Sequence, residues 1–481
     1  MSLWTAFDAA AATGGQAIGD WSVSGISIDT RTIEAGDLFV ALKAARDGHE
    51  FVAQALGKGA GAALVSHVPE GVSSDAPLLI VEDVLSALEA LGRAGRARTN
   101  ARVVAITGSV GKTSTKEMLR DVLGAQGRTH ASVASYNNHW GVPLTLARMP
   151  VDTEFAVIEI GMNHPGEIAP LAKMARPHVA LITTVGAAHL EAFENIDGIA
   201  AEKAAIMEGL EAGGIAILNG DIETAPVLKD VAKKRGVNAL WFGQTTQDYR
   251  LDQITLSGNT TVVQASAQGA PLLFKVQSAG SHFAMNGLGA LASAKALGAD
   301  IALAAQSIAR WTPFTGRGAR EIIALDGADS RMTLELIDDA YNANPTSLGA
   351  ALDVLAAAEV THDIGRVSKG RRIAYLGDMK ELGGDEAAMH SALARLPCIE
   401  EIDVIHCVGP LMRHCYDALP VAKRGHWEAS SAAMASHVGR DLDAGDVVLA
   451  KGSLSMGLAR VVDAVRKLSH TASKDAAKDD V

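Results

Sequence analysis

The chain has 481 residues, of which 48% are hydrophobic and 20% are charged, and its formal net charge is −12. This length predicts about three domains in an ordinary globular protein. The acidic balance argues against a nucleic-acid-binding protein, because that class concentrates basic residues on one face. No apolar stretch is long enough to span a bilayer, and no signal-peptide pattern is found. Cys398, Cys407 and Cys415 include no Cys-x-x-Cys pair, which predicts reduced thiols in place of a zinc site.

Short apolar runs separated by turns occupy residues 1–83 and predict a small α/β domain. The runs lie at residues 26–29, 37–42, 62–65 and 78–81. Polar insertions interrupt this pattern, at Asp29, Thr30 and Arg31 and again at residues 47–50. Periodicity alone leaves two interpretations of these insertions open, which are anion binding and the capping of turns.

A glycine-bracketed loop follows the apolar run at residues 103–106 and opens a helical pattern. A strand, a tight loop and a helix N-terminus in that order form an anion cradle, because backbone N–H groups and the helix dipole both favour a phosphate. Lys112 would reach the outer phosphates, and Thr113 would offer its hydroxyl to a magnesium ion. Only two residues separate Gly108 from Gly111, where the common pattern has four, so an ordinary glycine turn is the alternative. We predict a nucleotide site.

Two further α/β patterns follow in the chain. Near-continuous apolar runs at residues 155–160, 179–183 and 215–219 alternate with helical segments, which predicts a mostly parallel sheet covered on both faces. A region of alternating polarity, residues 240–276, precedes a helix that begins near Phe283. The second pattern has strands at residues 334–337, 373–376, 404–407 and 447–450. Residues from about 469 onward are polar without periodicity, which predicts a disordered tail.

Polar residues fall at the ends of the predicted central strands. Glu159 lies inside an apolar run, where a metal ion would compensate a carboxylate that is costly to bury; pairing with a lysine is the alternative. His189 follows the run at residues 179–183, and Lys203 lies in a helix predicted at residues 200–210. Together with Lys112, these residues predict magnesium-assisted phosphoryl transfer from ATP. A P-loop switch protein stays open as an alternative on these residues alone.

These motifs resemble the Mur ligases, which are ATP-dependent amide ligases of bacterial cell-wall synthesis. The shortened loop at residues 107–114 is that family's own version of the phosphate loop. The Asn-Ala-Asn-Pro segment at residues 342–345 and the Gly-Asp-Met-Lys-Glu-Leu-Gly segment at 377–383 resemble the members that add D-alanyl-D-alanine. Other matching segments are residues 29–31, 36–43, 47–51, 137–138, 141–143, 159–168, 338–345 and 451–453.

The resemblance implies three α/β domains. Residues 1–83 would bind the UDP-sugar, residues 84–313 would form a P-loop ATPase domain with a mostly parallel sheet, and residues 314–481 would be Rossmann-like. It also implies that ATP phosphorylates the terminal carboxylate of UDP-N-acetylmuramoyl-tripeptide and that the amine of D-alanyl-D-alanine attacks the acyl phosphate. Another Mur-type carboxylate–amine ligase and a nucleotide-dependent regulatory protein are the alternatives. Residues 342–345 argue against the first, and the presence of His189 and Lys203 argues against the second.

Site residues follow from the same resemblance. Lys112, His189 and Lys203 are implied in catalysis, with Lys203 carbamylated. Two magnesium ions are implied, one held by Thr113 and Glu159 and one by His189 and the modified Lys203. The implied ATP-binding residues are Gly108, Ser109, Val110, Gly111, Lys112, Thr113, Ser114, Asn286, Arg317 and Asp339. The implied substrate-binding residues are Asp29, Thr30, Arg31, Lys43, Asn137, Asn138, Asn163, His164, Asn342 and Asn344.

Two positions depart from the family pattern. Phe283 replaces an amide near the adenine, and Leu454 replaces an arginine after the Lys-Gly-Ser segment. We assign neither position a role.

The resemblance further implies a cytoplasmic, monomeric enzyme of peptidoglycan synthesis that binds its two small-molecule substrates and no nucleic acid.

Overall fold

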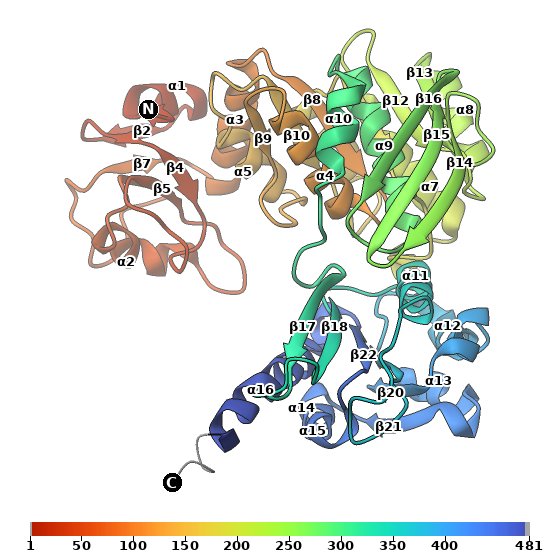
Figure 1. Ribbon diagram of the computed structural model, residues 1–481. Helices are drawn as coiled ribbons and strands as arrows, with labels where there is room; N and C mark the ends of the chain where they lie inside the picture. Colours follow the sequence, from red (N-terminus) through yellow and green to blue (C-terminus); the bar gives the residue numbers. More distant parts are fainter. Residues whose placement is uncertain (1, 477–481) are drawn as a thin grey trace.

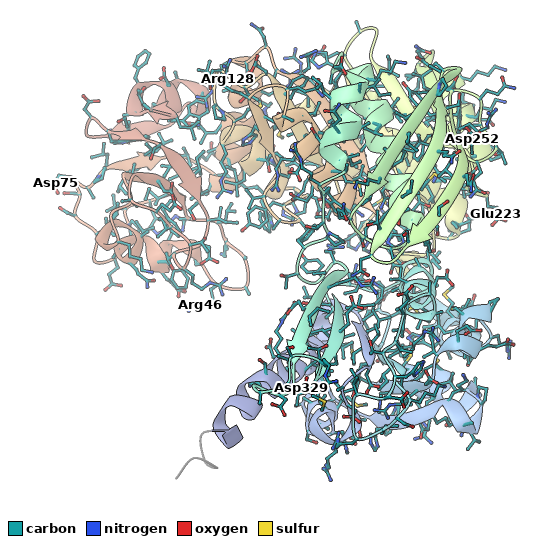
Figure 2. All side chains as sticks on the ribbon, in the orientation of Figure 1. Arg46, Asp75, Arg128, Glu223, Asp252 and Asp329 are labelled. Carbon is teal, nitrogen blue, oxygen red and sulfur yellow. The ribbon has the colours of Figure 1, made fainter. Side chains whose placement is uncertain are left out.

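The computed structural model describes residues 2–476 and contains three parts, each built on its own mostly parallel sheet (Figure 1). The N-terminal and C-terminal parts both adjoin the central part and lie on different sides of it. Charged side chains such as Arg46, Glu223 and Asp329 lie at the outer edges of all three parts (Figure 2). The predicted α/β fold class is confirmed. Among residues 2–476, the helices are all too short or too polar to cross a membrane.

The N-terminal sheet has five strands, of which four are parallel and the edge strand β2 is antiparallel. Its interior is aliphatic, and Leu38, Leu64 and Leu79 are fully buried. A two-stranded ribbon of β1 (Trp4–Thr5) and β3 (Ser22–Val23) lies outside the sheet. The sheet order is β2 (Gln16–Ile18), β7 (Leu78–Ile80), β6 (Ala62–Val65), β5 (Asp37–Val40) and β4 (Gly25–Ser27), with helices α1 (Ala6–Thr13) and α2 (Val52–Gly57).

Helix α3 (Val84–Ala97) connects the N-terminal part to the central part by packing on α5 (Gly141–Ala147). The Asp83 carboxylate caps its N-terminus by accepting the Ser86 N–H at 2.7 Å. The two helices approach closely, because a Cβ atom at Gly95 would lie 2.3 Å from the Leu146 carbonyl oxygen. This glycine contact therefore fixes the junction between the two parts.

The central sheet has nine strands, and β8 (Arg102–Thr107) lies between β10 (Phe155–Glu159) and β11 (Val179–Ile182). All three are parallel, with Ile106 opposite Glu159 on one side and Leu181 on the other, so their carboxyl ends meet at one edge. The order continues from β9 (Thr129–Ala131) beyond β10, and on the other side through β12 (Ile215–Asn219), β13 (Asn238–Gly243), β14 (Tyr249–Ser257), β15 (Thr260–Ala267) and β16 (Ala270–Val276). The strand β15 is antiparallel to both of its neighbours, β14 and β16.

Helices cover both faces of the central sheet, because its strand residues alternate between two cores. Val104 and Ile106 pack with α4 (Lys112–Gly124), α9 (Ser281–Ala296) and α10 (Ile301–Ile308). Val103 and Ala105 pack with α5, α6 (Ile168–Ala175), α7 (Ile196–Ala204) and α8 (Ala225–Arg235). The helix predicted at residues 200–210 is the end of α7 followed by a 3₁₀ turn, Ala205–Gly209.

The C-terminal sheet has six strands, five of them parallel, with an antiparallel edge strand β17. Its order is β17 (Ala319–Ala324), β18 (Thr333–Asp339), β22 (Val447–Lys451), β19 (Arg372–Gly377), β20 (Val404–Val408) and β21 (Arg424–Glu428). Its helices are α11 (Pro345–Ala356), α12 (Glu386–Leu393), α13 (Met412–Ala418), α14 (Ser431–Ala435), α15 (Val438–Asp441) and α16 (Ala459–Ala476). The disordered tail expected from residue 469 is wrong for residues 469–476, whose backbone continues α16. Residues 477–481 of that prediction lie outside the described residues.

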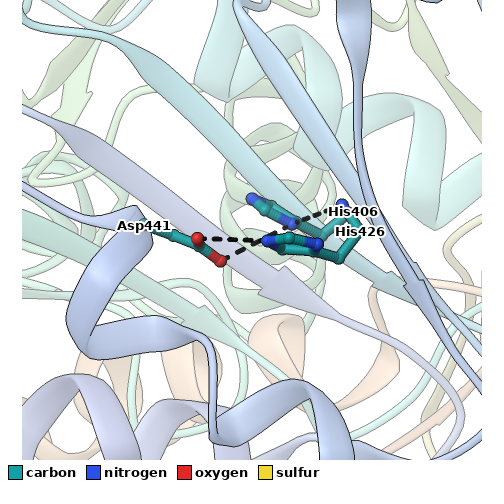
Figure 3. Close-up of side chains that lie close together, drawn as sticks. All are labelled: His406, His426 and Asp441. Carbon is teal, nitrogen blue, oxygen red and sulfur yellow. Dashed lines mark hydrogen bonds and ion pairs between the residues drawn. The ribbon is translucent and has the colours of Figure 1, made fainter.

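The three cysteines are free thiols, as predicted. Within the described part of the chain, the group that comes close enough for one metal ion is His406, His426 and Asp441, whose ligand atoms lie within 4.8 Å of one another (Figure 3). His426 Nε2 lies 3.2 Å from Asp441 Oδ1, and the backbone N–H of His426 donates to His406 Nδ1 at 3.0 Å. Because this donor already occupies the Nδ1 lone pair, we interpret the group as a hydrogen-bonded connection between β20, β21 and α15.

Candidate active site

The phosphate loop joins the carboxyl end of β8 to the first turn of α4. Gly108 and Gly111 have φ values of +154° and +85°, which favour glycine. A Cβ atom at Gly108 would lie 2.0 Å from Thr183 Oγ1, and one at Gly111 would lie 2.6 Å from Asn286 Oδ1. Both glycines are therefore required by the close approach of the loop to β11 and α9.

Side chains hold this loop from two directions. Ser109 Oγ donates to the Gly186 carbonyl oxygen at 3.0 Å, and Thr183 Oγ1 donates to the Val110 carbonyl oxygen at 2.6 Å. Lys112 Nζ donates to the Gly108 carbonyl oxygen at 2.5 Å. Burial lowers the pKa of Lys112, against the opposing effect of the Glu159 carboxylate. The loop is thus preorganised, with a cation folded over it.

Oxygen atoms gather beside the loop, at the ends of β10 and α4. Glu159 is fully buried, and its Oε1 accepts hydrogen bonds from Thr113 Oγ1 at 3.2 Å and from Asn137 Nδ2 at 2.8 Å. Among the described residues, Glu159 Oε2 has no hydrogen-bond partner, although it is buried. A buried carboxylate oxygen without a partner, next to a hydroxyl, is a donor set that suits a hard divalent cation. The residues present therefore fit a magnesium ion.

His189 and Lys203 lie on the same side of the central part. His189 has a φ of +60°, and its Nδ1 lies 2.5 Å from Glu381 Oε2 of the C-terminal part. Burial, together with the charges of Lys112 and Lys203, lowers the pKa of His189, and Glu381 opposes this shift. Lys203 is 1% exposed; burial first and the Lys112 charge second lower its pKa well below the usual range. The Lys112 charge thus disfavours the protonated forms of both His189 and Lys203.

A cleft of about 800 Å³ lies between the central and C-terminal parts and has the phosphate loop in its wall. Asn286, Arg317 and Asp339 line this cleft. The Arg317 guanidinium lies over the Tyr341 ring, 4.1 Å from its centroid. Lys451 Nζ donates to Asp339 Oδ2 at 2.6 Å, while burial raises the pKa of Asp339. The structure therefore brings the three residues implied for nucleotide contacts to the loop that precedes α4.

The residues implied for substrate binding divide into two groups. Five of them line the cleft: Asn137, Asn138, Asn163, Asn342 and Asn344. Two of these also cap helices, because Asn138 Oδ1 accepts the Gly141 N–H at 2.9 Å and Asn344 Oδ1 accepts the Ser347 N–H at 2.8 Å. The other five do not line the cleft: Asp29, Thr30, Arg31, Lys43 and His164.

These five residues lie on the surface around the cleft or in the N-terminal part. Asp29 and Arg31 form a local ion pair with 2.6 Å between Oδ2 and Nη2, while Lys43 is exposed. Thr30 is buried and contacts Gln54 Oε1 at 3.3 Å. His164 is exposed, with its Nδ1 3.4 Å from Glu167 Oε1. The structure leaves their assignment to the substrate as a prediction.

Two cleft residues that contact predicted site residues, Ser135 and Lys451, have no role in the sequence-based prediction. Ser135 Oγ lies 3.5 Å from Thr113 Oγ1 and accepts a hydrogen bond from Arg317 Nη2 at 3.3 Å. Lys451, at the end of β22, pairs with Asp339. The sequence could have indicated Lys451, because a polar residue at the end of an apolar strand is typical of the sheet edge where ligands bind. Ser135 lies in a loop whose sequence has no periodicity or motif that would single it out.

The two departures from the family pattern differ in their surroundings. Phe283 is buried at the start of α9, where its ring packs 4.0 Å from His282 and 5.5 Å from Trp311 between centroids. Leu454 is 63% exposed. Both line the cleft, so each presents an apolar surface there.

Three family models match the chain. They are the Mur ligase family catalytic domain over residues 22–96, the Mur ligase middle domain over 106–294, and the Mur ligase glutamate ligase domain over 328–454. Similar proteins include the UDP-N-acetylmuramoyl-tripeptide--D-alanyl-D-alanine ligases of Bacillus subtilis (34% identical; 81% of this chain, 80% of the relative) and Escherichia coli (36% identical; 81% and 82%).

Solved structures are similar over nearly the whole chain. The crystal structure of MurF from Acinetobacter baumannii has a TM-score of 0.81 at 29% identity and covers 96% of this chain and 99% of its own. MurF from Thermotoga maritima, solved in complex with ADP, has a TM-score of 0.76 at 25% identity, with coverage of 93% and 98%. The likeness includes all three parts of the molecule.

Proposed function

Because the chain belongs to the Mur ligase family, we propose that it joins D-alanyl-D-alanine to UDP-N-acetylmuramoyl-tripeptide with ATP. The product is the pentapeptide precursor of peptidoglycan, with ADP and phosphate. The single observation that carries this proposal is one cleft with a phosphate loop and a buried, unpartnered Glu159 oxygen on one side. Amide side chains that suit a peptide, such as Asn163 and Asn342, line the same cleft.

The chemistry proceeds through an acyl phosphate. A carboxylate oxygen of the tripeptide attacks the γ-phosphorus of ATP, the bond from that phosphorus to the bridging oxygen breaks, and ADP leaves. The neutral amine of the dipeptide then attacks the acyl carbon, an amide bond forms, and phosphate leaves with the amine proton released. Lys112, folded over the phosphate loop, neutralises charge on the transferred phosphoryl group.

Magnesium would be held by Thr113 and Glu159, because these supply the hydroxyl and the free carboxylate oxygen. When bound, the ion would neutralise phosphate charge and orient the transferred group. Asn137 holds Glu159 Oε1 through its amide, which leaves Oε2 as the free ligand atom. Residues of the chain thus fix the carboxylate before any cation arrives.

A second magnesium site belongs to the same proposal and involves His189 and a carbamylated Lys203. Lys203 is buried in α7, and the nearby Lys112 charge disfavours a second ammonium. A neutral amine can attack CO₂, form an N–C bond and lose a proton, which gives a carboxylate-like anion. Carbamylation therefore converts a buried cation into an anion that can complete a cation site.

In this proposal each of the three parts binds a different substrate. Residues 1–83 bind the UDP-sugar through Asp29, Thr30, Arg31 and Lys43, residues 84–313 bind ATP, and residues 314–481 close the cleft and bind the dipeptide. His164 extends the substrate contacts from the central part. The protein acts in the cytoplasm as a monomer.

A product assay tests the proposal. Purified protein, ATP, magnesium chloride, UDP-N-acetylmuramoyl-tripeptide and D-alanyl-D-alanine are incubated, and the pentapeptide is detected by mass. We expect product with the dipeptide and none when single amino acids replace it. No product, or equal product with single amino acids, would contradict the assignment and favour a different Mur-type ligase.

A further inference from the structure

Lys116 lies in α4, one turn beyond Lys112, and its side chain is fully buried. Its ammonium donates hydrogen bonds to the carbonyl oxygens of Ser132 at 2.8 Å and Ala134 at 2.6 Å, and Glu117 Oε1 lies 2.7 Å from the same nitrogen. These partners match the three N–H donors of an ammonium group. Lys116 therefore connects α4 to the loop that follows β9, here called the 132–137 loop.

The 132–137 loop contains a strained residue next to a carbonyl oxygen that Lys116 holds. Ala134 has a φ of +48°, in the left-handed region where a residue with a side chain is strained by roughly 1–2 kcal/mol. Beside it, Val133 is 54% exposed, so apolar burial at that residue adds little. Such a strained backbone persists only when its surroundings hold it. The bonds from Lys116 to the carbonyl oxygens of Ser132 and Ala134 contribute to this restraint directly at the strained residue, beside the backbone bonds of Ser132 to Val157 and of Asn137 to Gly161.

Residues of the 132–137 loop contact the candidate magnesium ligands directly. Ser132 Oγ accepts the backbone N–H of Glu159 at 3.0 Å, and Asn137 Nδ2 donates to Glu159 Oε1 at 2.8 Å. Ser135 Oγ lies 3.5 Å from Thr113 Oγ1. Three side chains of one loop thus contact the backbone, the carboxylate and the hydroxyl of the two ligand residues.

We propose that Lys116 is a positioning residue for the magnesium site. It lies outside the cleft wall and acts through the 132–137 loop, whose conformation sets the orientation of the Glu159 carboxylate. This inference depends on the proposed magnesium-dependent function. Partners that orient metal ligands commonly contribute 10- to 100-fold to metal affinity. Loss of Lys116 should therefore weaken magnesium binding without removing a group that touches the nucleotide.

Lys116→Met tests the inference, because it keeps the apolar stem of the side chain and removes the three donors. ADP affinity is measured by calorimetry without magnesium and with increasing magnesium chloride. We expect the magnesium concentration for half-maximal enhancement to rise by about tenfold, with ADP affinity in the absence of magnesium little changed. Hydrogen exchange should become faster in residues 132–137.

Two further variants keep the test decisive. Glu117→Gln retains both carbonyl contacts of Lys116 and should keep the wild-type magnesium requirement. Ser132→Ala removes only the hydroxyl at the Glu159 N–H and should raise the magnesium requirement in the same direction, which covers the case in which Lys116→Met fails to fold. A wild type that forms no product counts against the proposed function. An active wild type whose magnesium requirement is unchanged in both Lys116→Met and Ser132→Ala overturns the inference alone.

Discussion

On the phosphate-loop side of the cleft, Thr113 and Asn137 both donate hydrogen bonds to Glu159, and all three residues come from the central part. On the facing side, Asp339 pairs with Lys451 inside the C-terminal part. The two sides meet at a few contacts, among them Arg317 to Ser135 and His189 to Glu381. Each side is thus organised within its own part. Substitutions on the phosphate-loop side should alter metal-dependent chemistry, and those on the facing side should alter stability and nucleotide affinity.

The largest effect is expected from Glu159→Gln, which removes the free carboxylate charge while keeping the side-chain shape. Loss of several kcal/mol of charge stabilisation corresponds to about a thousandfold decrease in kcat. The measurement is the initial rate of phosphate release at saturating substrates. The control variant Glu223→Gln changes an exposed residue, and its kcat should equal that of the wild type. A near-normal kcat in Glu159→Gln would contradict the role of Glu159 as a magnesium ligand.

On the facing side, Lys451→Met removes a buried ammonium and leaves the partly buried Asp339 carboxylate without its cation. Breaking such a pair by removing one partner costs about 3 kcal/mol. Urea unfolding should show this loss for the variant. Lys369→Met, which breaks an exposed pair with Asp403, should change stability by less than about 1 kcal/mol. Equal stability losses in the two variants would contradict the expected difference between a buried lysine, Lys451, and an exposed one, Lys369.

Lys203→Ala belongs to the phosphate-loop side and should resemble Glu159→Gln. Loss of the proposed carbamate ligand should lower kcat by about a hundredfold, and added bicarbonate should not restore it because no amine is left. Full activity of Lys203→Ala would refute the carbamate.

The smallest effect concerns the C-terminal sheet alone. Burial, followed by the charges of His426, His437 and Arg371, lowers the pKa of His406 to about 3. Because the folded pKa lies below the unfolded value of about 6.5, the unfolded chain binds the proton more readily, and stability falls as pH drops below about 6.5. Between about pH 7 and pH 5 this group should cost about 2 kcal/mol.

His406→Asn keeps an acceptor for the His426 N–H and removes the titration. Urea unfolding at the two pH values should show a smaller acid-dependent loss in this variant than in the wild type. Nucleotide binding by the phosphate-loop side should be unaffected. Identical acid sensitivity in the two proteins would contradict the assignment to His406.

Buried strands were easier to predict from the sequence than edge strands, although the edge strand β4 overlaps the predicted run at residues 26–29. The strands β8, β10, β11 and β12 are flanked by helices on both faces and read as continuous apolar runs. The unpredicted strands β2, β9, β17 and β21 all lie at sheet edges. There one face or one side contacts solvent, so polar residues such as Arg320 and His426 break the apolar pattern.

Some features of the candidate site could likewise be predicted from local sequence, and others could not. The phosphate loop and Glu159 carry local signals, because glycines and a charge interrupt apolar runs. Pairs such as His189 with Glu381 and Asp339 with Lys451 join residues more than a hundred positions apart. Their contact depends on how strands are ordered within a sheet and on how the parts meet, and neither is encoded in local spacing.

Transfer of oxygen from the tripeptide carboxylate to the released phosphate is specific to an acyl-phosphate intermediate. UDP-N-acetylmuramoyl-tripeptide labelled with ¹⁸O in its terminal carboxylate is incubated with the protein, ATP, magnesium and D-alanyl-D-alanine, and the released phosphate is analysed by mass. If the reaction proceeds through an acyl phosphate, each phosphate released with pentapeptide carries one labelled oxygen, and this is the result we expect. Pentapeptide formed with unlabelled phosphate would contradict it.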